Sequence, residues 1–379
     1  MPERSRRFRN RRSTAIAIAL TAGLTAGACL LLSACDPNTP AADGSAGPSA
    51  VDSGTAKPGS APATGSGGPG KGDSSKTGGS KTGGSKTGGS TTAADARPAA
   101  SSAPVLNGTS ANGLTISDGT RFVVMNGTRV DFGTPVRDLA WSPDGKKAAF
   151  IDGDGDLVTA GPDGGGRVVV AENPGDQNWS HPAWQVRPYD AEYQMPALSN
   201  LLFAVRTAAG VSKLYGIPSG SVHGTPRVLR LNAEGGPGIG PLPQTGNVWP
   251  SGGGKYGDAV YANTADGQVY IRDDNVRQQG SAIAAGSEPA ADPAGDGIVF
   301  VRSVGGHDHL FLERDTQSGP VVKDLTPGAA TDYTEPAWSP NGTTIAARTP
   351  AGIVTLPADG SHAPVKVSGY QGLPAYRAS

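Results

Sequence analysis

Residues 138–150 read DLAWSPDGKKAAF, and residues 335–348 read EPAWSPNGTTIAAR. Both stretches place a Trp, a Ser-Pro pair and an Asp-Gly or Asn-Gly pair in the same order. Such self-similarity at a distance is typical of repeat architectures, so the search for further copies decides the fold.

Six copies of the motif appear when the chain is aligned on the Trp position. The anchors are Trp141, Trp184, Trp249, Ala291, Trp338 and Tyr376, at intervals of 43, 65, 42, 47 and 38 residues. Between anchors, short apolar runs alternate with Gly, Pro, Asn and Asp, which is typical of strands and turns. A repeat of about 40–45 residues with four strands indicates a propeller blade. Six anchors, each closing a set of four strands, predict an all-β, six-bladed β-propeller.

The repeated residues have a structural explanation. The Pro of Ser-Pro-Asp-Gly presets φ for a turn, and the Asx-Gly pair supplies a left-handed position. The large aromatic before the turn can fill the space between adjacent blades. Phe150, Phe203 and Phe300 follow their anchors as further expected packing residues. We therefore interpret Trp141, Trp184, Trp249, Trp338 and Tyr376 as structural anchors.

The stretches AWSPDGKKAAF and PAWSPNGTTIAAR resemble the WD40-like Asp-propeller (PD40) repeats of TolB-type proteins. The resemblance covers most of residues 110–379 and is strongest at 138–163 and 335–360. It implies a six-bladed propeller of the bacterial envelope that binds proteins or peptides. TolB carries an additional N-terminal α/β domain, whereas this chain has a low-complexity segment there, so only the architecture and the general binding role carry over.

The N-terminus has the features of an export signal. The first 12 residues carry six Arg and one Glu, and an apolar run at 15–34 follows. The final Leu32-Ser33-Ala34-Cys35 resembles the lipobox of bacterial lipoproteins, in which the Cys is lipidated and becomes the new N-terminus. We expect a signal peptide at 1–34, lipidation of Cys35, and localisation at the extracytoplasmic face of the cell membrane through this lipid anchor. An uncleaved membrane helix is the alternative, and the Sec and twin-arginine export routes both stay open.

Residues 35–104 are expected to be the lipidated Cys and a disordered tether. The segment consists largely of Gly, Ser, Ala, Thr, Pro and scattered Lys, with three copies of SKTGG at 75–89. Such a composition cannot bury enough apolar surface to offset chain entropy. Residues 105–379 form the expected propeller domain and carry a net charge of −7, against −1 for the whole chain. An acidic domain argues against nucleic acid as a partner.

Few residues suggest chemistry. Asp152, Asp154 and Asp156 alternate in IDGDGDL and are the only candidates for a Ca²⁺ site, although a turn between two strands explains them more simply. The domain contains no Gly-x-Ser-x-Gly nucleophile motif. No set of acidic or His residues is expected to recur at equivalent places in the repeats. We therefore expect no catalytic site and no cofactor.

The third repeat is the irregular one, with 22 residues more than a 43-residue repeat. About ten of them lie in QVRPYDAEYQMP (185–196), which contains Arg187, Tyr189, Tyr193 and Met195. Insertions in repeats map to loops, and Tyr, Arg and Met are enriched at interfaces. We interpret these four residues as a candidate binding surface; a loop without such a role is the alternative.

The overall hypothesis is a monomeric, membrane-anchored binding or scaffold module whose partners are envelope proteins or peptides. The alternative is a propeller enzyme or a solute-binding lipoprotein that uses the central channel, with or without Ca²⁺. Carboxylates or His residues converging at the channel mouth would favour this alternative. An apolar, Tyr-rich patch on the third blade would favour the binding module.

Overall fold

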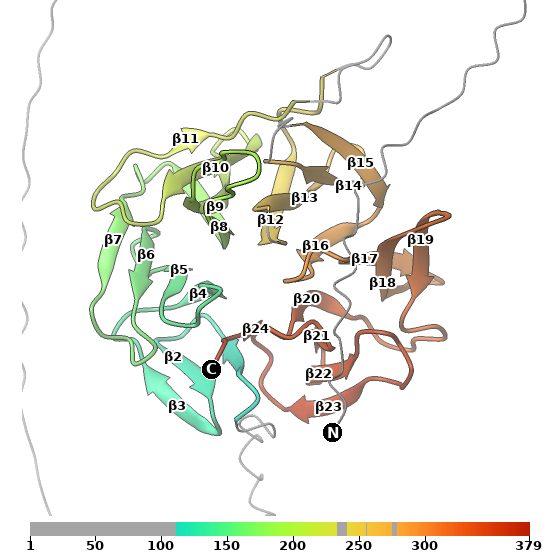
Figure 1. The fold of residues 1–379 in the computed structure, drawn as a ribbon. Coiled ribbons are helices and arrows are strands. Elements are labelled where there is room, and N and C mark those ends of the chain that lie inside the picture. The colour runs from blue at the N-terminus through green and yellow to red at the C-terminus, as the bar shows by residue number, and fades with distance from the viewer. Residues whose placement is uncertain (1–110, 233–240, 255, 275–278) are drawn as a thin grey trace, which may run out of the picture. The chain divides into compact units, whose positions relative to one another are not determined.

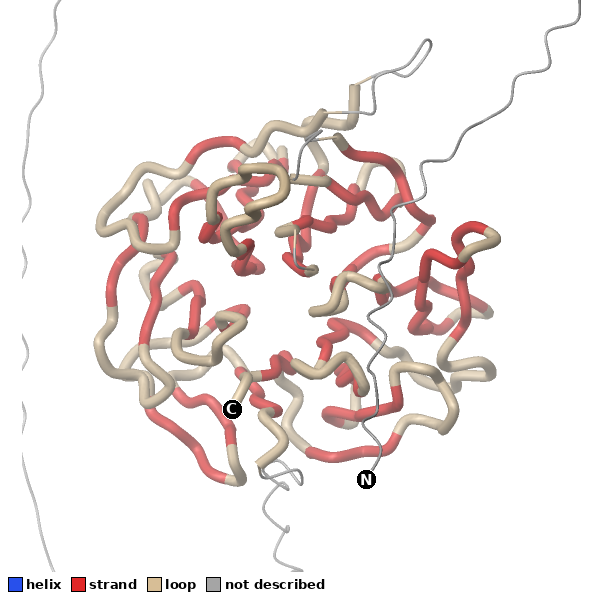
Figure 2. The backbone as a smooth tube through the Cα atoms, viewed as in Figure 1, coloured by secondary structure: helices blue, strands red, loops and turns tan. Residues whose placement is uncertain are grey.

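The computed structural model describes residues 111–379, except 233–240, 255 and 275–278. All described residues belong to one compact unit, Ala93–Ser379. The expected signal peptide, Cys35 and the tether lie outside the described residues. The described part is all-β, with 24 strands joined by turns and loops and without helices (Figure 2). It accordingly contains no helix with the length and apolar character needed to cross a bilayer.

The strands form six antiparallel sheets of four, arranged in a ring as the blades of a propeller (Figure 1). Blade one contains β24 (Leu373–Tyr376), β1 (Leu114–Ser117), β2 (Phe122–Met125) and β3 (Thr128–Asp131). Blade two contains β4 (Arg137–Trp141), β5 (Ala148–Ile151), β6 (Leu157–Ala160) and β7 (Val168–Ala171). Blade three contains β8 (Gln177–Arg187), β9 (Leu198–Thr207), β10 (Ser212–Pro218) and β11 (Arg227–Val228).

The remaining blades follow the same order. Blade four contains β12 (Asn247–Gly253), β13 (Asp258–Asn263), β14 (Gln268–Arg272) and β15 (Gly280–Ala285). Blade five contains β16 (Ser287–Ala291), β17 (Ile298–Val304), β18 (His307–Thr316) and β19 (Gly319–Asp324). Blade six contains β20 (Thr334–Trp338), β21 (Thr344–Thr349), β22 (Gly352–Pro357) and β23 (Val365–Ser368). The predicted six-bladed propeller is confirmed.

The ring is closed by the last strand of the chain. β24 pairs antiparallel with β1, so that Tyr376 lies opposite Leu114 and Leu373 lies opposite Ser117. Blade one is thus built from both ends of the domain (Figure 1). This pairing of the first and last strands of the described domain closes the ring.

The anchor strands are the innermost strands of the blades. β4, β8, β12, β16, β20 and β24 contact one another in sequence, and β24 contacts β4. The expectation that each anchor closes a set of four strands needs correction, because an anchor strand opens its own blade everywhere except in blade one. There β24 completes the set begun by β1, β2 and β3.

The repeated turn works as its residue types predict. The N–H of Gly145 donates to the carbonyl of Ser142 at 2.8 Å, and Gly145 has a φ of +67°. Gly342 repeats this bond to Ser339 at 2.9 Å with a φ of +69°. Because only Gly adopts this backbone conformation without strain, the Asx-Gly pair recurs in the turns after β4 and β20.

The hydrophobic core consists of six clusters, each lying between two adjacent blades. A blade strand therefore buries side chains on both faces. In β5, Phe150 packs toward blade one, whereas its neighbour Ile151 packs toward blade three. Phe150, Phe203 and Phe300 are fully buried.

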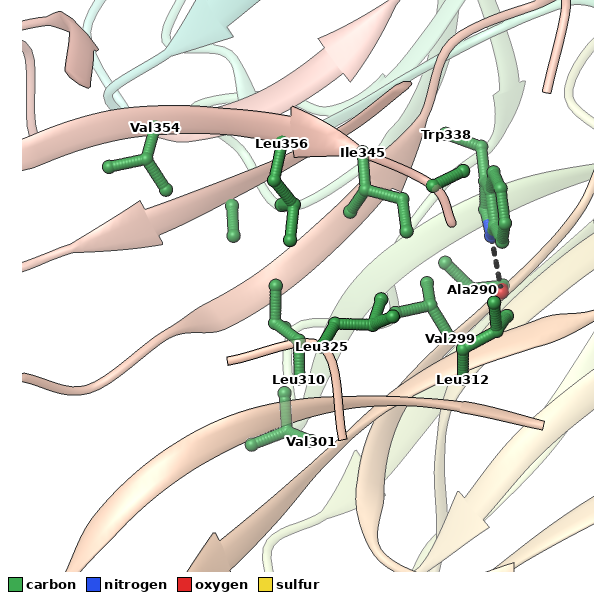
Figure 3. Close-up of a cluster of buried hydrophobic side chains, with 12 residues drawn as sticks. Ala290, Val299, Val301, Leu310, Leu312, Leu325, Trp338, Ile345, Val354 and Leu356 are labelled. Atoms are coloured by element: carbon green, nitrogen blue, oxygen red, sulfur yellow. Dashed lines mark hydrogen bonds between the residues drawn. The ribbon is translucent and has the colours of Figure 1, made fainter. Parts of the chain in front are cut away.

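Three anchor indoles join neighbouring blades through hydrogen bonds. The Nε1–H of Trp338 donates to the carbonyl of Ala290 in blade five at 2.9 Å (Figure 3). Trp184 donates to the carbonyl of Ala140 at 3.2 Å. Trp141 donates to the Thr115 hydroxyl at 2.9 Å. Each indole thus packs against the preceding blade and satisfies its only polar atom there.

Candidate functional site

Five of the six innermost strands carry a β-bulge at the same place. In β4, for example, the pairing register with β5 shifts between Arg137 and Ala140. The first residue inside each bulge is a non-glycine residue with a φ between +48° and +55°. These five residues, which we call the bulge ring, are Asp138, His181, Trp249, Glu288 and Glu335.

The local sequence favours a bulge at these positions. In four of the five strands the next residue is a Pro: Pro182, Pro250, Pro289 and Pro336. Proline has no N–H, and it is tolerated inside a sheet mainly where a bulge interrupts the ladder. A left-handed φ costs an L-residue on the order of 1 kcal/mol. Its recurrence in five blades shows that the fold holds these side chains in one defined direction.

The bulge ring lines a cavity at the centre of the propeller. The cavity has a volume of about 470 Å³ and extends from the bulge ring to the turns that follow the innermost strands. Blade one contributes Leu373, which precedes Tyr376 by the same spacing as Glu335 precedes Trp338. The volume lies within the range of about 300–1,000 Å³ that is usual for ligand pockets.

His181 lies between two carboxylates of the ring. Its Nε2 is 3.3 Å from Oε1 of Glu335, and its Nδ1 is 3.9 Å from Oδ2 of Asp138. Burial alone would lower the pKa of His181, but the neighbouring carboxylates, Glu335 first among them, outweigh burial and raise this pKa. Burial would likewise raise the pKa of Glu335, but the bond to His181 prevails and lowers it. Each of the two groups therefore favours the charged form of the other.

Glu288 is in a different electrostatic position. Its Oε2 accepts the backbone N–H of Glu335 at 2.6 Å. Burial, and then the negative charge of Glu335, raise the pKa of Glu288 to about 7. The cavity thus contains three carboxyl groups and one imidazole among its described lining residues, and one of the carboxyl groups changes charge near neutral pH.

In β12 the aromatic residue lies at the bulge position, and a glycine, Gly252, lies three residues later at the interblade position. The register of β12 against β13 shifts between Val248 and Ser251, so Trp249 occupies the place of Asp138 and Gly252 the place of Trp141. The alignment that made Trp249 an anchor equivalent to Trp141 is therefore corrected. A Cβ on Gly252 would lie 2.1 Å from the carbonyl oxygen of Trp184. Because the backbones of blades three and four approach so closely, no aromatic fits between them here, and the Trp249 indole faces the cavity instead.

The insertion of the third repeat lies at the rim of the cavity. Val186 and Pro188 line the cavity, and the loop continues with Tyr189. Tyr189 is 57% exposed and Tyr193 is 50% exposed. Met195 is half-buried, and its backbone pairs with that of Asp190 across the loop.

Arg187 supports this loop from within. It is 5% exposed, unlike a residue that would contact a partner directly. Its guanidinium donates to the carbonyl of Pro196 at 3.0 Å and to the carbonyl of Asp274 at 2.6 Å. These bonds tie both ends of the loop to blade four, so the exposed tyrosines are presented on a braced segment.

The three aspartates of IDGDGDL belong to a turn. Oδ1 of Asp152 accepts the backbone N–H groups of Asp154 at 3.0 Å and of Asp156 at 3.1 Å. Oδ1 of Asp156 accepts the N–H of Asn173 at 2.7 Å. Within the described ranges, no group of three or more His, Cys, Asp or Glu side chains is arranged to hold a metal ion.

The sequence analysis missed the bulge ring. Its expectation that no acidic or His residues recur at equivalent places is wrong, because Asp138, His181, Glu288 and Glu335 do so. The signal was present in the aligned motifs DLAW, HPAW, EPAA and EPAW, whose first letters are these residues. These residues lie three positions before the anchor residue, on the opposite side of the bulge from the aromatic side chain that defines the repeat.

Comparisons with known proteins support the fold. The sequence matches no model of a known protein family and no curated protein. The structure is similar to TolB from Acinetobacter baumannii, with a TM-score of 0.50 and 17% identity over 70% of this chain and 65% of that one. A chain of the nidogen–laminin complex matches with a TM-score of 0.46 and 11% identity, over 69% of this chain and 95% of that chain. The match to TolB covers less than two thirds of the length of the TolB chain. At 17% identity the likeness to TolB supports the propeller fold alone, and membership of the PD40 repeat family stays a prediction.

Proposed function

We propose that this chain is a lipid-anchored, extracytoplasmic binding module of the bacterial cell envelope, whose partner is a protein or peptide. The partner docks at the mouth of the central cavity, where residues 188–196 form the rim. No catalytic step is part of this role. The TolB-like fold is compatible with it, and the N-terminal lipobox-like motif supports the membrane location.

The observation that carries the proposal is the exposed pair Tyr189 and Tyr193 on a braced loop. Both side chains expose half or more of their surface, and the buried Arg187 holds the loop that carries them. Tyr supplies a large amphipathic contact area at low entropic cost, and a fixed loop loses less conformational freedom on binding. The rim is therefore preorganised for binding a partner.

The bulge ring supports a second candidate, the binding of a small solute in the channel. Its four titratable residues and one Trp converge on a cavity of ligand size, as binding pockets do. Both candidate ligands would enter through the same mouth of the cavity. The affinity for a protein partner would depend on the rim residues, whereas the affinity for a small solute would depend on the cavity residues alone.

The first test is in-cell crosslinking followed by mass spectrometry, with the native chain, a Tyr189→Ala/Tyr193→Ala variant and a Cys35→Ala variant. The double tyrosine variant is expected to lose a discrete envelope partner that the native chain captures. Cys35→Ala should lose the same partner, because the chain would no longer be held at the membrane.

A matched control is Val321→Ala/Val322→Ala on the outermost strand β19, where the two side chains are 50% and 41% exposed. This control should retain the partner. If the tyrosine variant captures the same partner at the native level, the rim is not the interface. The melting temperatures of the tyrosine and valine variants should stay close to that of the native chain, since the four replaced side chains are exposed.

A further inference from the structure

The charges that line the cavity are unbalanced. Asp138, Glu288 and Glu335 supply three carboxyl groups, and His181 is the only basic side chain among the described lining residues. His181 is placed between Asp138 and Glu335. The carboxylate of Glu288 accepts a hydrogen bond from the backbone N–H of Glu335. A bound cation would complete the set at this position.

Charged groups behind the ring do not remove this imbalance. Arg348 on β21 acts on Glu288 and favours its ionised form, whereas Asp308 on β18 opposes ionisation. Arg348 itself donates from Nε to the Thr334 hydroxyl at 3.3 Å. Neither Arg348 nor Asp308 lines the cavity, so both leave its interior open to a ligand cation.

An aromatic side chain lies beside these carboxylates. The indole of Trp249 meets the His181 ring edge-to-face, with centroids 5.8 Å apart and an interplanar angle of 71°. Indole faces attract ammonium groups, and carboxylates pair with them. Ammonium groups are therefore the ligand class that the two kinds of side chain select together.

Trp249 is at this place for a structural reason that is independent of the carboxylates. Gly252 takes the interblade position, because the backbone of blade three excludes any Cβ there. The indole that packs between blades in β4, β8 and β20 is turned into the cavity in β12 alone. The walls between the polar groups are largely apolar and include Pro182, Pro289 and Pro336. This combination of apolar walls and a few convergent polar groups is that of a ligand pocket.

We propose that the central cavity binds an organic ammonium group between Glu288 and Trp249. The group is the side chain of a Lys that the docked partner presents, or the head of a free alkylamine with the same chemistry. The inference rests on the proposed function, because the Lys would enter through the mouth at which the partner docks. It adds the chemistry that the cavity selects.

The proposal predicts a pH dependence with a defined sign. Glu288 has a pKa of about 7, so its ionised fraction rises about tenfold between pH 6 and pH 8. Burial alone would lower the pKa of His181, but the neighbouring carboxylates raise it, so its positive charge persists to a higher pH than that of a free imidazole. Asp138 and Glu335 remain facing the ligand. Ammonium binding should therefore strengthen as the pH rises from 6 to 8.

The experiment is isothermal titration calorimetry of the purified full chain at low ionic strength with a matched pair of probes. Nα-acetyl-lysine methylamide carries the ammonium group, whereas Nα-acetyl-norleucine methylamide lacks it and ends in the Cε methyl group. The lysine probe is expected to bind about tenfold more tightly than the neutral probe, as a charge-assisted bond would produce. A third probe, n-butylammonium, distinguishes a free amine from a peptide-borne Lys.

Variants separate the proposal from a general effect of acidity. Glu288→Gln has the same shape and should abolish the preference for the lysine probe. Glu172→Gln is the matched control, because Glu172 lies on the surface with a side chain that is 67% exposed. It should retain the full preference. Three results would each overturn the proposal. They are equal affinity for the lysine and norleucine probes, a preference for the lysine probe that survives Glu288→Gln, and binding of CaCl₂ in place of the amines.

The outcome can be distinguished from failure of the proposed function. Tyr189→Ala/Tyr193→Ala should leave the affinity for the small lysine probe unchanged, because neither tyrosine is among the residues that line the cavity. If the lysine probe fails while crosslinking remains sensitive to the tyrosines, the cation site falls and the docking role stands. If crosslinking is insensitive while the probe binds, the cavity serves a free amine.

Discussion

Replacement of Gly252 by Ala tests the close approach of blades three and four. The added Cβ would lie 2.1 Å from the carbonyl oxygen of Trp184 and 3.3 Å from Cα of Gln185. Real Cβ contacts essentially never fall below 3.0 Å, so β12 and β8 would have to separate by almost 1 Å. The atoms in contact are backbone atoms, so no side-chain rotation can relieve the clash. Overpacking costs about 1–3 kcal/mol in general, and a clash against backbone belongs at the upper end, near 3 kcal/mol.

The measurement is the free energy of unfolding from urea denaturation, followed by Trp fluorescence. Gly220→Ala is the matched control, since a Cβ there meets nothing within 4 Å and its φ is not positive. The control should be neutral or more stable by up to about 1 kcal/mol, because Ala restricts the unfolded chain. If the free energy of unfolding of Gly252→Ala lies within about 0.5 kcal/mol of the native value, the two blades can separate at little cost. The account of why Trp249 faces the cavity would then be incorrect.

Two further predictions concern stability. Trp338→Phe removes the Nε1–H bond to the carbonyl of Ala290 and leaves a small void, which should cost about 1–3 kcal/mol in urea unfolding; a loss below about 0.5 kcal/mol would show that the interblade bond is dispensable. The pKa of Glu288 is raised from 4.5 to about 7 in the folded chain. Between these two pH values the folded state binds more protons than the unfolded state, so the free energy of unfolding falls as the pH rises through about 7. Glu288→Gln should therefore gain stability relative to the native chain by up to about 3 kcal/mol between pH 5 and pH 8, and parallel pH profiles of the two proteins would contradict the assignment.

The candidate site could have been predicted only in part. Tyr189 and Tyr193 were identified from the insertion, and both are exposed at the rim. Arg187 was selected for its residue type, yet it lies buried and braces the loop. Residue type alone does not distinguish an Arg that contacts a partner from one that satisfies backbone carbonyls, because both roles use the same donors.

The sequence by itself determined the architecture of this domain. The turn after Trp141 needs a glycine at a left-handed position, and the strand after it needs apolar residues on both faces, as Phe150 and Ile151 show. These are local requirements that recur in each blade, so they appear in the chain as a repeat. Counting the repeats was enough to predict six blades.

Only the tertiary structure decided which residues meet at the centre. Asp138, His181, Glu288 and Glu335 are far apart in sequence, and their convergence depends on closure of the ring by β24 and on the register of each innermost strand. Trp249 shows the difference most clearly. A shift of three residues within one strand moves an indole from the interblade core to the cavity. Strand register is set by long-range pairing and by contacts such as that of Gly252 with the Trp184 carbonyl.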